Sequence, residues 1–173
     1  VLNFVKQTRK TAQKVFEKHI VGITPKYETR VIETPSYLVN FMPTGAMMPI
    51  NGWTDQPFSV FFVTTDPTAS PSSSIPEIIQ LLLHEEYGHA VNFSNSMTRY
   101  AAKPTFPELF GSAGFATHIS DGISFFREFE FMRMLKELAK KKNLDKDEAE
   151  FLKILKTGSD VKTMLLENEF IIW

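Results

Sequence analysis

The spacing of hydrophobic residues changes along the chain from helical to strand-like and back. Apolar residues between Leu2 and Ile20 recur at helical intervals, with Lys and Arg between them, and Gly22 to Pro25 ends the pattern. Two runs rich in β-branched and aromatic residues predict strands at 30–34 and 58–65. Residues 35–57 are rich in Pro, Gly and Met, so we expect a long loop between the strands.

The second half of the chain has helical periodicity. Ser74 and Glu77 form a capping box with Pro76 in the first turn, which predicts a helix that begins there and runs to about Asn95. Further helical segments are expected at residues 108–142, 145–156 and 161–168. The predicted fold class is therefore α+β and mostly helical.

A polar block interrupts the apolar helix directly after residues 78–83, with the sequence His84-Glu85-Glu86-Tyr87-Gly88-His89. In an H-E-x-x-H helix, two histidines four apart bind one zinc ion and the glutamate is the general base. Here the histidines are five apart, so a regular α-helix would splay them by roughly 140°. A shared metal therefore requires a local i→i+5 bulge, which Gly88 can permit.

The same block has a simpler interpretation, because helical histidines are usually core or surface residues and Glu-rich helices are usually solvated. However, the chain has only 4 histidines, and two of them lie in a polar break within a core-seeking helix. A metal would satisfy both imidazoles and the carboxylates together. We therefore predict that His84 and His89 bind one zinc ion and that Glu85 is the general base.

A third ligand must come from downstream, and two candidates compete. Asp121 and Glu128 are seven apart, hence within about 20° on one helix face, and His118 lies a turn earlier on that stripe. Glu108 follows His84 by 24 residues, a separation resembling that in zinc peptidases with a glutamate ligand. Glu108 also suits a first-turn acid that a helix dipole favours. The residues alone leave this choice open.

Composition narrows the classes of protein. The 19 Lys and Arg nearly balance the 20 Asp and Glu, so nucleic acid and anionic membranes are not expected partners. Without cysteine, a metal must rest on His and carboxylates, which favours catalytic over structural zinc. No long apolar stretch or signal-peptide pattern occurs, so we expect a cytoplasmic protein.

The length suits a single domain over residues 1–173, and no linker or repeat divides it. Residue 1 is Val rather than Met, so the chain also fits a segment of a longer protein. Aromatic residues between Phe125 and Phe131 fall on more than one side of their helix, which is then buried all round or lacks a partner. We therefore expect self-association, or contact with missing segments, at this helix.

Three ordered segments resemble the motifs of one family: Phe61-Phe62-Val63-Thr64-Thr65-Asp66-Pro67, Leu83-His84-Glu85-Glu86-Tyr87-Gly88-His89, and Asp121-Gly122-Ile123-Ser124-Phe125-Phe126-Arg127-Glu128. They are similar to the Y-V-N-T-x-D-P strand, H-E-x-x-P-G-H-H helix and E-G-W-A-L-Y-x-E helix of a large prokaryotic domain-of-unknown-function family. That family is placed with gluzincin-like zinc metallopeptidases. The likeness covers roughly residues 31–130.

The resemblance implies that His84, His89 and Asp121 are zinc ligands and that Glu85 is the general base. The chain departs from the motifs: the helix segment is one residue shorter and lacks the proline, and Ala90 replaces a histidine. The side chain of Asp is one methylene shorter than that of Glu. Its helix must therefore lie closer to the metal by roughly 1.3–1.5 Å. The five-residue spacing itself resembles the H-E-L-L-G-H motif of dipeptidyl peptidase III.

The expected fold is thus a zincin-like metal helix preceded by a short strand or sheet edge. We expect one zinc ion and hydrolysis of a peptide substrate, with Glu85 acting on a metal-bound water and with Glu128 and His118 orienting a ligand. Residues 58–65 are the candidate sheet edge for an extended substrate.

Tyr87 is expected to pack in the core rather than to stabilise an oxyanion. No Tyr or His follows Glu128, so the activity of this chain is left open. The alternative to a peptidase is a degenerate, non-catalytic domain of the same fold that binds metal or a partner.

Overall fold

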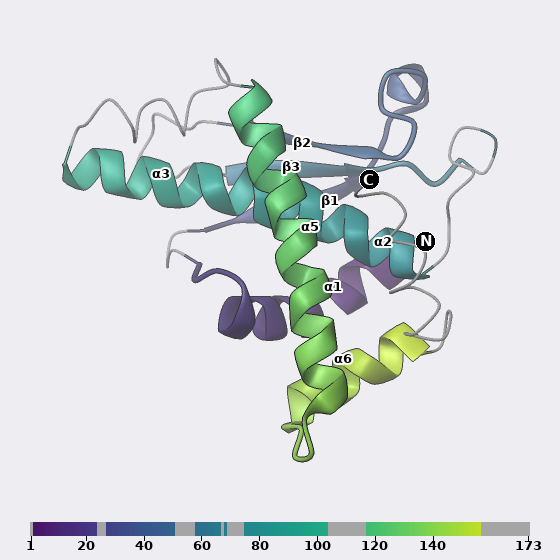
Figure 1. The fold of residues 1–173 in the computed structure, drawn as a ribbon. Helices are drawn as coiled ribbons and strands as arrows, with labels where there is room; N and C mark the ends of the chain where they lie inside the picture. Colours follow the sequence, from purple (N-terminus) through teal and green to yellow (C-terminus); the bar gives the residue numbers. More distant parts are fainter. Residues whose placement is uncertain are drawn as a thin grey trace.

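The computed structural model describes residues 2–23, 27–50, 58–66, 68, 75–103 and 117–156, and excludes the side chains of 75–77 and 117–120. Its elements are α1 (Leu2–His19), β1 (Thr29–Glu33), the 3-10 helix η1 (Ser36–Leu38), β2 (Gly45–Ile50), β3 (Phe58–Val63), α2 (Ile75–Leu82), the π-helix η2 (Leu83–Ala90), α3 (Val91–Ala102), α5 (Thr117–Lys140) and α6 (Lys146–Lys156). The predicted α+β, mostly helical class is confirmed (Figure 1). No described helix is long and apolar enough to cross a membrane.

The strands form one sheet in the order β1-β3-β2. β1 runs parallel to β3, and β2 runs antiparallel to it. Alternate residues of β3, Ser59, Phe61 and Val63, are buried, so one sheet face packs on the core. The strand predicted at 58–65 is confirmed, but its proposed role as a sheet edge is wrong because β3 has a partner on both sides.

β2 lies inside residues 35–57, where we expected a loop. Gly45 and Pro49 are poor strand formers, which explains the wrong prediction. Both fit the positions they occupy: proline is tolerated in an edge strand, and a side chain at Gly45 would place its Cβ 2.6 Å from the carbonyl oxygen of Phe62. β2 is therefore an edge strand whose Gly and Pro content made it read as a loop.

The core joins the helices to one another through Phe16 of α1. Its ring makes edge-to-face contacts with Tyr87 of η2, Phe131 of α5 and Phe151 of α6, at centroid distances of 4.9, 5.7 and 5.4 Å. All four rings are buried. These contacts explain why the amphipathic pattern of residues 2–20 predicts α1 so well: its apolar face is the centre of the core.

The three segments α2, η2 and α3 form one continuous helix. Leu82 and Val91, which flank η2, both have right-handed helical backbone angles. The helix begins at Ile75, as the capping box predicts, and ends at Ala102 rather than near Asn95. The long helix α5 crosses this continuous helix at η2 (Figure 1).

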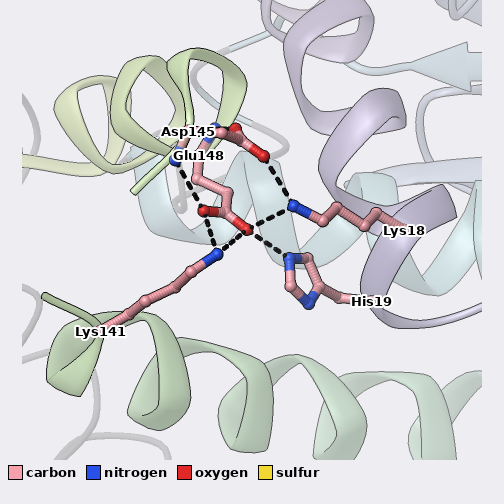
Figure 2. Close-up of polar contacts among 5 residues, drawn as sticks. All are labelled: Lys18, His19, Lys141, Asp145 and Glu148. Carbon is pink, nitrogen blue, oxygen red and sulfur yellow. Dashed lines mark hydrogen bonds and ion pairs between the residues drawn. The ribbon is translucent and has the colours of Figure 1, made fainter. Parts of the chain in front are cut away.

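The side chain of Glu148 links α6 to α1 and to the residue that follows α5. Its carboxylate accepts hydrogen bonds from Lys18, His19 and Lys141 at 2.6–2.9 Å (Figure 2). Asp145 and Glu148 also form a reciprocal capping box at the start of α6, with N···O distances of 2.9 and 3.0 Å. The helix expected at 145–156 is confirmed, whereas the one expected at 161–168 lies outside the described residues.

Candidate metal centre

The π-helix brings the two motif histidines to one side of the metal helix. Hydrogen bonds from i to i+5 in η2 place residues five apart over one another, and the ring centroids of His84 and His89 lie 5.2 Å apart. The local bulge that the five-residue spacing predicts is therefore confirmed. Two imidazoles that a regular α-helix would separate now face a common point.

Asp121 of α5 completes the group. One ligand atom from each of His84, His89 and Asp121 lies within 4.8 Å of the others. His89 Nε2 and Asp121 Oδ1 are 3.5 Å apart, close to the roughly 3.4 Å between two ligand atoms on a tetrahedral zinc ion. All three side chains are half-buried. The donors thus have the type and spacing to hold a metal ion, and the predicted ligand set meets at one place.

The approach of α5 to η2 depends on Gly88. A Cβ atom at Gly88 would lie 2.1 Å from Ser124 Oγ and 2.4 Å from Ser124 Cα. Any side chain there would push α5 away from the metal helix. We expected Gly88 to permit the bulge itself, but its close contact with α5 is the feature that requires glycine, and this approach is what the shorter Asp121 carboxylate needs.

Glu128 holds one of the histidines in place from α5. Its carboxylate bonds His84 Nδ1 at 2.6 Å and accepts a second hydrogen bond from Gln80 Nε2 at 2.6 Å. When Nδ1 donates to this carboxylate, Nε2 of His84 is the atom that can bind a metal. Glu128 therefore contacts His84 as an orienting carboxylate would, and its role in orienting a ligand stays a prediction. Glu108 and the side chain of His118 lie outside the described residues.

The two histidines have opposite pKa shifts. Burial lowers the pKa of His84, but its hydrogen bond to Glu128 and the charges of Glu85, Glu128 and Asp121 outweigh burial and raise it. Burial and the charge of His84 lower the pKa of His89, and Asp121 offsets this only in part. His89 is therefore readily available as the neutral imidazole that a metal requires.

Glu85 lies between the sheet and the three candidate ligands His84, His89 and Asp121, which we call the metal group. The backbone N–H of Met47, in the edge strand β2, donates a hydrogen bond to its carboxylate. Burial raises the pKa of Glu85, while the charge of His84 and the Met47 hydrogen bond oppose this only in part. A carboxylate with a raised pKa beside a metal group is suited to accept and return a proton.

The neighbouring Glu86 has a different role, which the sequence pattern did not reveal. It is fully buried and accepts hydrogen bonds from Arg9 Nε at 2.8 Å and from the Tyr27 hydroxyl at 2.6 Å. This buried ion pair fixes the π-helix to α1 and to the segment before β1. A second carboxylate in an apolar helix signals a buried partner, but nothing local identifies Arg9 as that partner.

Tyr87 points into the core, as predicted. Its ring is fully buried against Phe16, and its hydroxyl has no hydrogen-bond partner among the residues that the structure describes. It is therefore a packing residue and does not face the metal group.

Comparisons of the chain with protein-family models, with curated proteins and with solved structures found no match. The resemblance to a gluzincin-like family thus stays a prediction based on three short motifs.

Proposed function

We propose that this protein is a zinc-dependent peptide hydrolase with one zinc ion held by His84, His89 and Asp121. The observation that carries the proposal is the π-helix, which brings ligand atoms of His84 and His89 within 4.8 Å of one of Asp121, with Glu85 next to His84 in the sequence. Two imidazoles and one carboxylate leave a position open for water or substrate, as catalytic zinc sites require.

When bound, zinc would polarise the scissile carbonyl and acidify a water molecule. The residues of the chain perform the remaining tasks. Glu85 takes the proton from the attacking water and returns it to the leaving amine. Glu128 keeps His84 in the orientation in which Nε2 is the ligand.

The substrate strand would pair with β2 rather than with β3. β2 is an edge strand, and the Met47 N–H already reaches Glu85. An extended peptide that adds to this edge would therefore run beside the general base. An edge strand next to a metal-binding helix also supports our proposal of a zincin-like fold.

The test separates metal binding from catalysis. The wild-type protein and Glu85→Gln are loaded with zinc, their metal content is measured, and hydrolysis of an unstructured peptide is followed over long incubations. We expect about one zinc per chain in both proteins and hydrolysis in the wild type alone. We expect that hydrolysis to be slow, because none of the residues that we assign to the site is an oxyanion donor, and such a donor is worth about 10²–10³ in rate.

Three other outcomes decide against parts of the proposal. Equal hydrolysis by Glu85→Gln would exclude Glu85 as the base. Zinc binding without hydrolysis in either protein would favour the alternative, a non-catalytic metal-binding domain. A wild-type protein that takes up no zinc would end the proposal.

A further inference from the structure

Phe125 is an exposed aromatic residue in direct contact with the metal group. Its ring packs edge to face on His84 at a centroid distance of 5.3 Å, and yet the residue is 63% exposed. It lies on α5 one turn after Asp121, so the two residues share a helix face. A large apolar surface therefore borders the centre and remains open on its outer side.

The exposure is not a general property of the aromatic run on α5. Phe131 belongs to the core and is 2% exposed, whereas Phe126 and Phe129 are exposed and make no ring contact with a metal-ligand residue in the described part of the chain. Of these phenylalanines, Phe125 alone has a described ring contact with a metal-ligand residue. Packing of the core thus accounts for Phe131 but not for the position of Phe125.

We propose that Phe125 is a specificity-determining residue, which forms an apolar subsite for a hydrophobic side chain next to the scissile bond. This inference rests on the proposed function. A carbonyl that binds the metal must lie close to the His84 ring, and consecutive Cα atoms of a peptide are 3.8 Å apart. The side chain next to that carbonyl can therefore reach the Phe125 ring and cover its exposed surface.

An aromatic or long aliphatic side chain fits this surface best, because ring contacts add to the burial of apolar area. A small or charged side chain would leave the ring in water or lose its own hydration. The substrates favoured by this subsite are thus peptides with Phe or Leu, rather than Gly or Asp, beside the cleaved bond.

The test uses two zinc-binding probes that differ only by a benzyl group, acetohydroxamic acid and 3-phenylpropanohydroxamic acid. Each is titrated by calorimetry into the zinc-loaded protein, so the readout is binding and needs no turnover. We expect the wild type to prefer the phenyl probe by about 10-fold or more. Phe125→Ala should reduce this preference to about 2-fold or less, and Phe125→Leu should keep most of it.

Phe126→Ala is the matched control, since it removes the next phenylalanine in the sequence, which is 55% exposed and shares no helix face with Asp121. Phe126→Ala should still bind the phenyl probe more tightly than acetohydroxamic acid. Zinc affinity is measured for each variant, because a lost preference with unchanged zinc affinity separates a subsite from mere support of His84.

Equal binding of both probes by the wild type would overturn the subsite and leave the proposed function intact. The subsite would also be overturned, with the proposed function intact, if the two alanine variants had the same probe preference. A lower zinc affinity of Phe125→Ala would have the same consequence. A protein that binds neither zinc nor either probe would end the proposed function and the subsite together.

Discussion

Gly88 and Ser124 lie so close together that no side chain fits between the metal helix and α5. An added Cβ at Gly88 would lie 2.4 Å from Ser124 Cα, a backbone atom that no rotamer change can move. This contact sets the distance between η2 and α5, and Asp121 reaches the histidines across it. A glycine in the metal motif thus determines whether an aspartate on another helix can be a ligand.

Gly88→Ala should therefore destabilise the protein and weaken zinc binding together. We expect a loss of about 2–3 kcal/mol in the free energy of unfolding, the range of an overpacked core. Adding Ser124→Gly should not restore it, because Ser124 Cα remains in the way. Gly122→Ala on α5 is the control, since its Cβ would meet nothing within 4 Å. Urea unfolding and chelator competition measure the two effects, and equal behaviour of both alanine variants would contradict the account.

The third ligand can be assigned by comparing two carboxylates. Asp121→Asn should weaken zinc affinity by a factor of about 10 or more, while Glu108→Gln should change it little. The reason is that Asp121 Oδ1 lies 3.5 Å from His89 Nε2. Zinc affinity of both variants is measured by competition with a chelator. The opposite order of effects would move the site to Glu108.

The buried pair of Glu86 and Arg9 should contribute strongly to stability. Glu86→Gln leaves a largely buried guanidinium without its counter-charge, and we expect a loss of roughly 3 kcal/mol in urea unfolding. Lys14→Met, on the same helix as Arg9, removes an exposed ion pair with Asp147 and should cost less than about 1 kcal/mol. Similar losses in both variants would show that the buried pair does not fix η2.

Low pH should remove the contribution that Glu148 makes to the stability of the folded state. Burial raises its pKa, but hydrogen bonds from Lys141, the Asp145 backbone, Lys18 and His19 outweigh burial and hold the pKa well below its usual range. A depressed carboxyl pKa stabilises the fold above the unfolded value of about 4.3, and this stabilisation is lost as the pH falls toward the folded pKa.

Glu148→Gln should consequently be less stable than the wild type at pH 7 by about 1.5–3 kcal/mol, and the difference should shrink at pH 3. Unfolding in urea at the two pH values measures it. Asp147→Asn, which removes an exposed ion pair with Lys14 and a first-turn acid of α6, serves as the control and should cost less than about 1 kcal/mol at either pH. A difference that is the same at pH 3 and pH 7 would contradict the role of Glu148.

Local spacing predicted how the residues at the centre of the candidate site are arranged. Two histidines five apart on one helix can share a metal only through an i→i+5 turn, so His84 and His89 predict the π-helix directly. Asp121 and Glu128 share a helix face in the sequence, and the structure places both beside these histidines. Periodicity carries such information because it is a property of single helices.

Contacts between elements could not be predicted in this way. The partner of Glu86 is Arg9, 77 residues earlier, and their pairing depends on how α1 packs. The edge of the sheet was assigned wrongly because strand order is a tertiary property, and Pro49 made β2, one of the two edge strands, read as a loop. The close contact at Gly88 likewise exists only once α5 crosses η2.

Most of what we propose depends on one zinc ion held by His84, His89 and Asp121. Diffraction data from zinc-loaded crystals, collected just above and just below the zinc absorption edge, test it most directly. We expect one anomalous peak, present only above the edge, bounded by His84 Nε2, His89 and Asp121 and next to Glu85. No peak there, or a peak held by other residues, would contradict it.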